Sequence, residues 1–136
     1  MSDTTASNER RTRQRFAAQR DGKTIFWVEL DGHRLPLNDL SLEGFSYASE
    51  ISPELGLEFP FALRLEGIPD RVRGRARIVN YVNGAAGGQV GCRFLNFDGD
   101  GAFDLHDWLT VHVITSASVR ISEQEAKAIV AGPSLI

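Results

Sequence analysis

Two short clusters of polar residues have the types and spacing of an anion-binding site. In the first, Arg10, Arg11 and Arg15 lie within the segment Glu9–Phe16. A guanidinium presents a planar fork of donors that matches phosphate oxygens and the O6/N7 edge of guanine, and its flat face stacks on bases. These arginines are therefore suited to clamping a nucleotide diester, although Arg11 and Arg15, four residues apart, would equally share the solvated face of a helix.

The second cluster is Asp39, Ser41 and Gly44, between two segments with strand character. An aspartate carboxylate accepts from the N1 and N2 hydrogens of guanine, a serine hydroxyl donates or accepts, and glycine tolerates close approach and unusual backbone angles. The alternative is an ordinary loop, with an Asx-turn at Asn38 or Asp39 and a positive φ at Gly44. Each cluster alone is unspecific, so their order along the chain carries the argument.

The other polar and reactive residues have simpler explanations. Arg73, Arg75 and Arg77 alternate with small and apolar residues, as on the solvated face of a strand, although they would also flank a ligand surface. The aspartates after Phe97 lack the spacing of a calcium loop, and the histidines lack that of a zinc site. Cys92, the only cysteine, lies at an apolar strand position. With no catalytic constellation, we expect neither an enzyme nor a metal or cofactor.

The elements that must position these residues are mostly strands. Apolar and polar residues alternate, or β-branched and aromatic residues dominate, in segments 24–30, 44–48, 57–65, 72–78 and 90–95. Asp31-Gly32 signals a hairpin, and Pro60 indicates a strand edge or a bulge. Short strands without interleaved helices predict a mainly β fold, an antiparallel barrel or sandwich.

Two helices are predicted after the strands. Apolar residues at helical spacing predict the first helix over residues 103–115. Ser122 and Glu125 form a capping-box pattern that opens the second helix, and Gly132-Pro133 ends it.

Length, charge and composition limit the classes of function. The 136 residues, 42% hydrophobic and 24% charged, suit one globular domain. The net charge of −3 argues against a DNA or RNA binder, whereas five arginines in residues 1–20 form a basic patch suited to a compact anion. Without a long apolar run, a signal peptide or a possible disulfide, we expect a cytoplasmic protein that does not insert into membranes. We divide the chain into a disordered tail (1–8), a strand-rich domain (9–115) and a C-terminal helical extension (116–136).

In their order along the chain, the two clusters resemble the motifs of a known family. The pattern R-x-x-x-R, a strand hairpin and then D-x-S-x-x-G is similar to that of PilZ domains, which are cyclic di-GMP receptors. The matching residues here are Arg11, Arg15, Asp39, Ser41 and Gly44. Val90 to Asn96 is similar to the family's last core strand, with Gly91 and Phe94 at its glycine and phenylalanine positions. The resemblance covers residues 9–115 and implies a six- or seven-stranded antiparallel β-barrel with a C-terminal helix or helices, with residues 9–20 as the segment that wraps the ligand.

The resemblance also implies roles for the motif residues. Arg11 and Arg15 would contact phosphates and a guanine edge, Asp39 and Ser41 would hold a guanine, and Gly44 would permit the loop. The implied protein is a bacterial second-messenger receptor that changes conformation on binding and signals to an unidentified downstream protein. Self-association as a homodimer is a further route of output.

Arg10 bears on the number of ligands. In the family, the residue before the first motif arginine influences stoichiometry, and an arginine there implies an intercalated dimer, two molecules of cyclic di-GMP per protomer. Two other functions stay open at this point. One is an adaptor or structural protein of pilus, motility or exopolysaccharide machinery that keeps this fold without nucleotide. The other is a small RNA-binding barrel, which would need stacking aromatics, and the arginine segment holds only Phe16.

Overall fold

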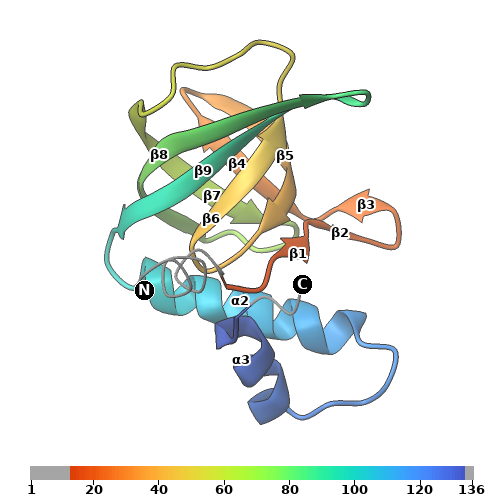
Figure 1. Ribbon diagram of the computed structural model, residues 1–136. Coiled ribbons are helices and arrows are strands. Elements are labelled where there is room, and N and C mark those ends of the chain that lie inside the picture. Colours follow the sequence, from red (N-terminus) through yellow and green to blue (C-terminus); the bar gives the residue numbers. More distant parts are fainter. Residues whose placement is uncertain (1–12, 134–136) are drawn as a thin grey trace, which may run out of the picture.

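Six antiparallel strands close into a barrel within residues 13–133, the part of the chain that the computed structural model describes. The strands are β4 (Phe26–Leu30), β5 (His33–Leu40), β6 (Gly44–Ala48), β7 (Glu58–Leu65), β8 (Arg71–Gly84) and β9 (Gly87–Phe97). Their order is β5-β4-β7-β8-β9-β6, and β6 pairs back with β5 to close the ring (Figure 1). The predicted fold class, a mainly β antiparallel barrel with C-terminal helices, is confirmed.

Three further short strands precede the barrel. β1 (Phe16–Ala17) adds to β5, and β2 (Gln19–Arg20) pairs with β3 (Lys23–Thr24) in a separate hairpin. The turn of that hairpin is Asp21-Gly22, where φ is 54° and 78°. Asp31-Gly32, with φ of 52° and 82°, makes the predicted turn between β4 and β5 in the same way, because type I′ turns need two residues in the left-handed region.

Pro60 lies where β7 has a neighbouring strand on one side only, which agrees with the strand edge that its sequence position indicated. The pairing of β7 with β4 ends at Ala62, so Pro60 lies beyond that ladder. Its missing N–H therefore removes no hydrogen bond there, while β7 continues to pair with β8 opposite Arg75.

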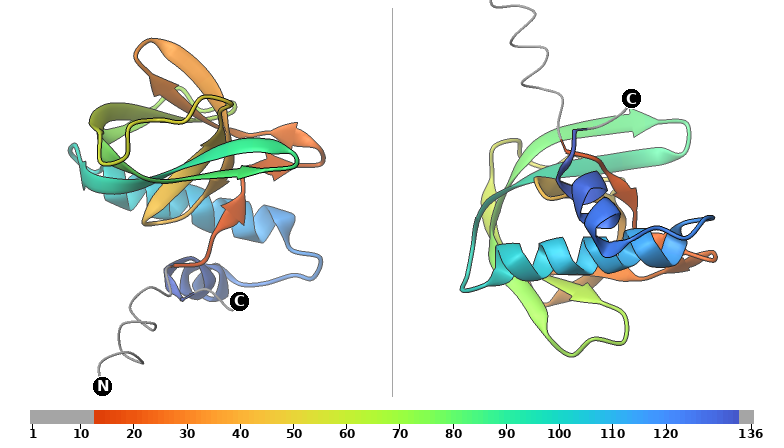
Figure 2. Two further views of the ribbon diagram at one scale, coloured as in Figure 1. Left: turned by 45° about the horizontal axis from the view of Figure 1, so that its top comes forward. Right: turned by 90° about the horizontal axis from the view of Figure 1, so that it is seen from below.

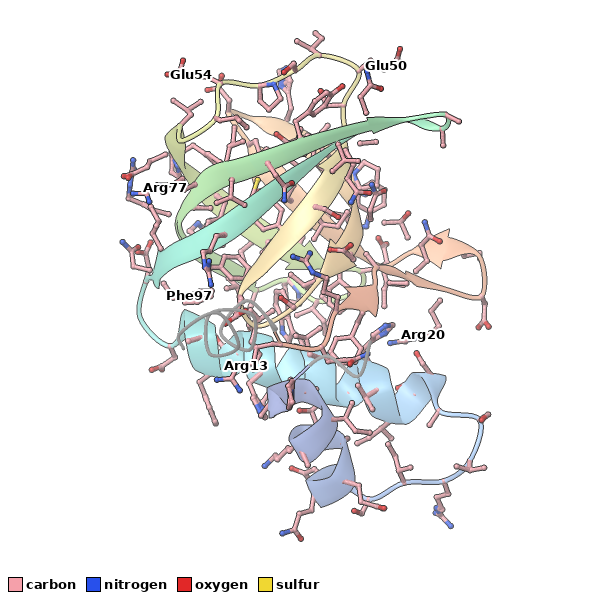
Figure 3. The ribbon with its side chains drawn as sticks, viewed as in Figure 1. Arg13, Arg20, Glu50, Glu54, Arg77 and Phe97 are labelled. Atoms are coloured by element: carbon pink, nitrogen blue, oxygen red, sulfur yellow. The ribbon has the colours of Figure 1, made fainter. Side chains whose placement is uncertain are left out.

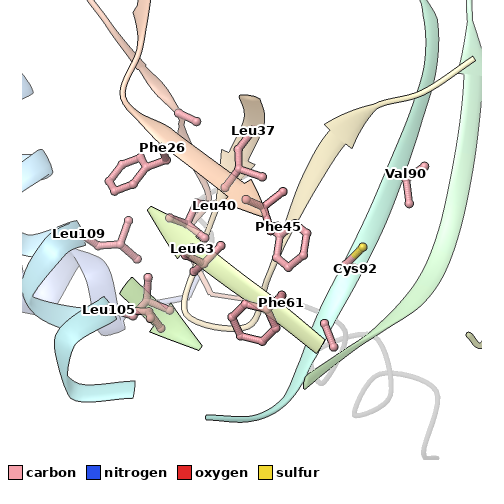
Figure 4. Close-up of a cluster of buried hydrophobic side chains, with 14 of the residues drawn as sticks. Phe26, Leu37, Leu40, Phe45, Phe61, Leu63, Val90, Cys92, Leu105 and Leu109 are labelled. Atoms are coloured by element: carbon pink, nitrogen blue, oxygen red, sulfur yellow. The ribbon is translucent and has the colours of Figure 1, made fainter. Parts of the chain in front are cut away.

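Inward-facing residues of the barrel strands form the core, where Phe26, Phe45 and Phe61 lie among aliphatic side chains (Figure 4). Phe45 and Phe61 are nearly fully buried, and their ring centroids lie 6.0 Å apart. Phe94 contacts both rings, at 5.6 and 5.1 Å between centroids. Each buried large apolar side chain contributes roughly 1.5–3 kcal/mol of transfer free energy, so this cluster is a main source of stability.

The two helices follow the strands. α2 (Gly101–Ser116) lies across one end of the barrel, and α3 (Glu123–Ala131) packs on α2 (Figure 2). The predicted capping box is present, since Ser122 Oγ accepts from the Glu125 N–H and the Glu125 carboxylate accepts from the Ser122 N–H. Ala126 and Val130 are fully buried, which makes α3 part of the packed structure. Neither helix in residues 13–133 is long and apolar enough to cross a membrane.

Gly44 provides a test of how tightly β6 and β9 approach. A Cβ at this position would lie 2.0 Å from the Cys92 carbonyl oxygen, a backbone atom that cannot move aside. We expect Gly44→Ala to lower the free energy of unfolding by about 2 kcal/mol or more, measured by urea denaturation, because the added methyl group forces the strands apart. Gly84→Ala is the matched control in a strand, since nothing lies within 4 Å of its added Cβ. Equal stability of the two variants would contradict the close approach.

Candidate functional site

A short strand fastens the arginine segment to the barrel. β1 pairs antiparallel with the end of β5, with Phe16 opposite Leu40 and Ala17 opposite Asp39. The Phe16 side chain packs against the core, so β1 is anchored by an apolar contact as well as by backbone hydrogen bonds. This register determines the position of Arg15, the residue immediately before β1.

Arg15 and Asp39 form an ion pair that joins the two predicted motifs. Nη1 of Arg15 lies 3.0 Å from Oδ1 of Asp39. The two residues are diagonal neighbours, because Ala17 is the residue directly opposite Asp39, and a long side chain reaches across that diagonal. The side chains are 47% and 25% exposed, so the pair contributes at most about 1 kcal/mol to stability. Both groups are accessible to a ligand that offers each a new partner.

Ser41 builds the turn between β5 and β6. Its buried Oγ accepts from the N–H groups of Glu43 and Gly44, at 3.0 and 3.2 Å. The Ser41 N–H in turn donates to the Gly44 carbonyl at 2.9 Å. The serine therefore shapes the backbone beside Asp39, while Asp39 itself, in β5, presents its carboxylate to solvent.

Gly44 follows this turn as the first residue of β6, and its φ lies outside the left-handed region. The loop alternative that gave it a positive φ is therefore wrong. The glycine is required by the close approach of the Cys92 carbonyl described above.

The residues before β1 contact the β5–β6 turn and the end of α3. The Arg13 N–H donates to the Glu43 carboxylate at 3.3 Å, and the Arg13 guanidinium donates to the Ala131 carbonyl (Figure 3). The Gln14 N–H donates to the Gly132 carbonyl at 3.2 Å. Carbonyls at a helix C-terminus lack intrahelical donors and carry partial negative charge, which favours an arginine there. Arg10 and Arg11, the other two predicted ligand contacts of this segment, lie outside the described residues.

His112 of α2 connects the helix to the segment that follows Arg15. The imidazole is 5% exposed; its Nε2 lies 3.1 Å from the Ala17 carbonyl oxygen and its Nδ1 lies 3.0 Å from Arg20 Nη2. A carbonyl only accepts, so the network assigns the proton to Nε2 and leaves Nδ1 to accept from the guanidinium. The rings of Phe16 and Phe26 meet the imidazole edge to face, with centroids 6.4 and 5.4 Å away.

Burial lowers the pKa of His112, and the charge of Arg20 lowers it further, whereas the hydrogen bond to Ala17 opposes both effects. The imidazole is therefore neutral at neutral pH, as the bond from Arg20 requires. The sequence pattern did not assign this residue a role. Its signal was the helical spacing that places His112 with Leu105 and Leu109, both fully buried, on the side of α2 that faces the barrel.

The surface has two pockets of interest, and only one of them borders the Arg15–Asp39 ion pair. A groove of about 520 Å³ runs beside β1, with Arg15 and Phe16 on one wall and residues 116–119 and Ile129 on the other. A second pocket, of about 310 Å³, lies beside the turn between β4 and β5 and is lined mainly by apolar residues such as Leu57 and Phe59. The groove borders Arg15, so the surface around the ion pair is concave on its α2 side.

The remaining sequence candidates are placed as follows. Cys92 is buried in the core, where burial raises its pKa to about 12, so the thiol is not a nucleophile at neutral pH. Arg73, Arg75 and Arg77 are exposed on the outer face of β8, and Arg77 pairs with Glu58. Within residues 13–133, no three His, Cys, Asp or Glu side chains gather in a way that could hold a metal ion.

Comparisons with known proteins support the fold and go no further. No model of a protein family matches the chain, and no curated protein matches it. Among solved structures, the chain is similar to the crystal structure of an uncharacterized Legionella protein, with a TM-score of 0.51 and 13% identity, over 72% of this chain and 91% of that one. At this identity the similarity shows a shared fold.

The position of His112 predicts a pH dependence of stability. Its pKa in the folded protein is below the value of about 6.5 expected for an unfolded chain. The unfolded state therefore binds more protons as the pH falls below about 6.5, and this residue makes the protein less stable there. We expect the melting temperature to fall less between about pH 7.5 and pH 5.5 in His112→Gln than in the wild type. His33→Gln, at an exposed position, is the control. An unchanged pH dependence in His112→Gln would contradict the buried neutral imidazole.

Proposed function

We propose that this protein is a PilZ-type receptor that binds cyclic di-GMP at the surface around Arg15 and Asp39. The observation that carries the proposal is their ion pair, which brings together one residue from each motif, 24 positions apart in the sequence. The barrel and its C-terminal helices agree with the architecture that the family resemblance implies. We further propose that the protein acts in the cytoplasm of a bacterium and signals through a downstream protein or self-association.

Binding at this site is an exchange of partners. In the ligand-free protein the Arg15 fork and the Asp39 carboxylate satisfy each other at 3.0 Å. A ligand phosphate offers the guanidinium a new acceptor, and the N1–H and N2–H groups of guanine offer the carboxylate new donors. A ligand with only one of these groups would leave a charge without its partner. The site therefore favours a compact cyclic dinucleotide that holds a phosphodiester and a guanine in fixed positions, an arrangement that GTP and a flexible RNA lack.

Contacts of Arg13 connect the binding site to the β5–β6 turn and to α3, so a change at Arg15 on ligand binding would reach both. Arg13 contacts both Glu43 in the β5–β6 turn and Ala131 at the end of α3. Movement of Arg15 toward a ligand would shift Arg13, two residues before it, and so alter the contact with α3. In this mechanism α3 and the segment before β1 form the surface that changes for a partner.

Titration with four ligands tests the proposal. We expect calorimetry to show binding of cyclic di-GMP and no binding of cyclic di-AMP, GTP or a short RNA. Arg15→Ala and Asp39→Ala should each weaken cyclic di-GMP binding by at least ~1.5 kcal/mol, more than tenfold, as is typical of charge-assisted contacts. Arg120→Ala, at an exposed position between α2 and α3, should bind as the wild type does. Wild-type protein that is silent toward cyclic di-GMP would favour a nucleotide-independent adaptor of pilus, motility or polysaccharide machinery.

The stoichiometry is a separate prediction, and it depends on Arg10. Two ligands carry more phosphate charge than one, so a third guanidinium in the arginine segment has an acceptor available. We expect two molecules of cyclic di-GMP per chain, and a ratio closer to one for Arg10→Ala. The ratio is measured by calorimetry at protein concentrations well above Kd. A wild-type ratio near one would overturn this part of the proposal and leave the ligand assignment intact.

A further inference from the structure

The outer face of the sheet continues the candidate site beyond the two motifs. Strand register places Ser46 beside Asp39 on β6, and Gly91 of β9 beside Ser46. Two residues away along β6, Gly44 lies opposite Arg93. Residues paired across a sheet share a face, and the row between, which includes Phe45, faces the core. Asp39, Ser46 and Arg93 therefore belong to the same outer surface.

Ser46 is an unusual member of this surface. The residue is only 1% exposed, and within the described chain its hydroxyl has no hydrogen-bond partner. A hydroxyl withdrawn from water without a partner is unfavourable, so such a group suggests a missing ligand contact. Its register partner Asp39 is the residue that Arg15 leaves in the exchange proposed above.

Neutral amides lie on the strands on either side of Ser46 and on β8. Asn38 Nδ2 donates to Gln89 Oε1 at 2.9 Å, a bond that joins β5 to β9 across β6. Asn80 lies over Gly91, so closely that a Cβ there would be 2.3 Å from Asn80 Oδ1. Amides both donate and accept, which suits the mixed edges of a nucleobase and the hydroxyl groups of a ribose.

Arg93 completes the far side of this surface. It is exposed, and no carboxylate of the described residues lies within salt-bridge distance of its guanidinium. Its direct neighbour on β8 is another cation, Arg77, which is already paired with Glu58. Like charges directly opposite on a sheet destabilise it, so an anion bound at Arg93 would relieve a repulsion built into the strands.

The spacing between Asp39 and Arg93 suits one flat ligand. Two strand separations make about 10 Å across the sheet, and two residues make about 7 Å along it, so their backbones are roughly 12 Å apart. The flexible arginine side chain shortens that gap. Gly44, in the row of Arg93, places no side chain between them.

We propose that the ligand surface runs from Asp39 across Ser46 to Arg93, where Arg93 binds a second phosphate of the nucleotide and Ser46 hydrogen-bonds its base or ribose. This inference rests on the proposed function and extends it to residues outside both motifs. Arg15 and Arg93 then hold phosphates on either side of a base bound at Asp39. The amide side chains of Asn38, Gln89 and Asn80 border this surface on the sides away from the two arginines and offer donors and acceptors to the polar edges of the ligand.

Two variants test this surface, with calorimetric titration of the full chain by cyclic di-GMP. We expect Arg93→Gln to weaken binding at least tenfold. Arg75→Gln is the matched control. Arg75 is also an exposed arginine on the outer face, but its register partners are Pro60 on β7 and Asn96 on β9, so it lies away from β6. Ser46→Ala should weaken binding severalfold without lowering the melting temperature, since it removes a hydroxyl that has no hydrogen-bond partner within residues 13–133.

The outcomes separate this inference from the proposed function. If the wild type does not bind cyclic di-GMP, the proposed function and the inference both fail. If the wild type binds and Arg93→Gln binds equally well, only the inference fails. Equal losses in Arg93→Gln and Arg75→Gln would also overturn it, because they would show a general effect of charge. A loss confined to Arg93→Gln and Ser46→Ala, with melting temperatures preserved, supports the extended surface.

Discussion

The candidate site depends on the pairing of Phe16 and Ala17 with the last residues of β5. This short ladder fixes Arg15 diagonally across from Asp39 and turns Phe16 toward the core. The Ala17 carbonyl accepts from His112, so α2 holds the same strand from its other side. Without this pairing the arginine segment would have no defined position on the barrel, and two clusters distant in sequence would remain unrelated in space.

Within the D-x-S-x-x-G motif, Ser41 and Gly44 have structural roles, and Asp39 is available for recognition. Ser41 organises the β5–β6 turn with its hydroxyl, and Gly44 lets β6 approach the backbone of β9. Both are needed to close the barrel whether or not a ligand binds. Asp39 alone presents an accessible side chain. A protein that kept this fold without nucleotide would therefore retain the serine and the glycine, and the aspartate is the residue that discriminates between the two functions.

Local patterns in the sequence predicted strands of the barrel and both helices, but they missed the short strands β1, β2 and β3 and did not predict the contacts between elements. Alternation predicted the strands, Asp31-Gly32 predicted a hairpin, and Ser122 with Glu125 predicted the start of α3, because each depends on neighbouring residues. The alternation could not distinguish a closed barrel from a sandwich, because closure depends on the pairing of β6 with β5 on one side and with β9 on the other. The bond between Arg20 and His112 joins residues 92 positions apart and has no local signature.

The contact between Arg13 and Ala131 has a consequence for the order in which the molecule assembles. Neighbouring strands such as β8 and β9 form hairpins, whose short loops close at little cost in chain entropy. Arg13 and Ala131 are 118 positions apart, so their contact has almost the largest sequence separation possible within residues 13–133. Contacts of this kind are favourable only after the intervening barrel and helices are in place. The segment that carries Arg15 is therefore secured at both sides only in the completed fold, and a partly folded chain would display the Asp39 strand before its arginine partner is held.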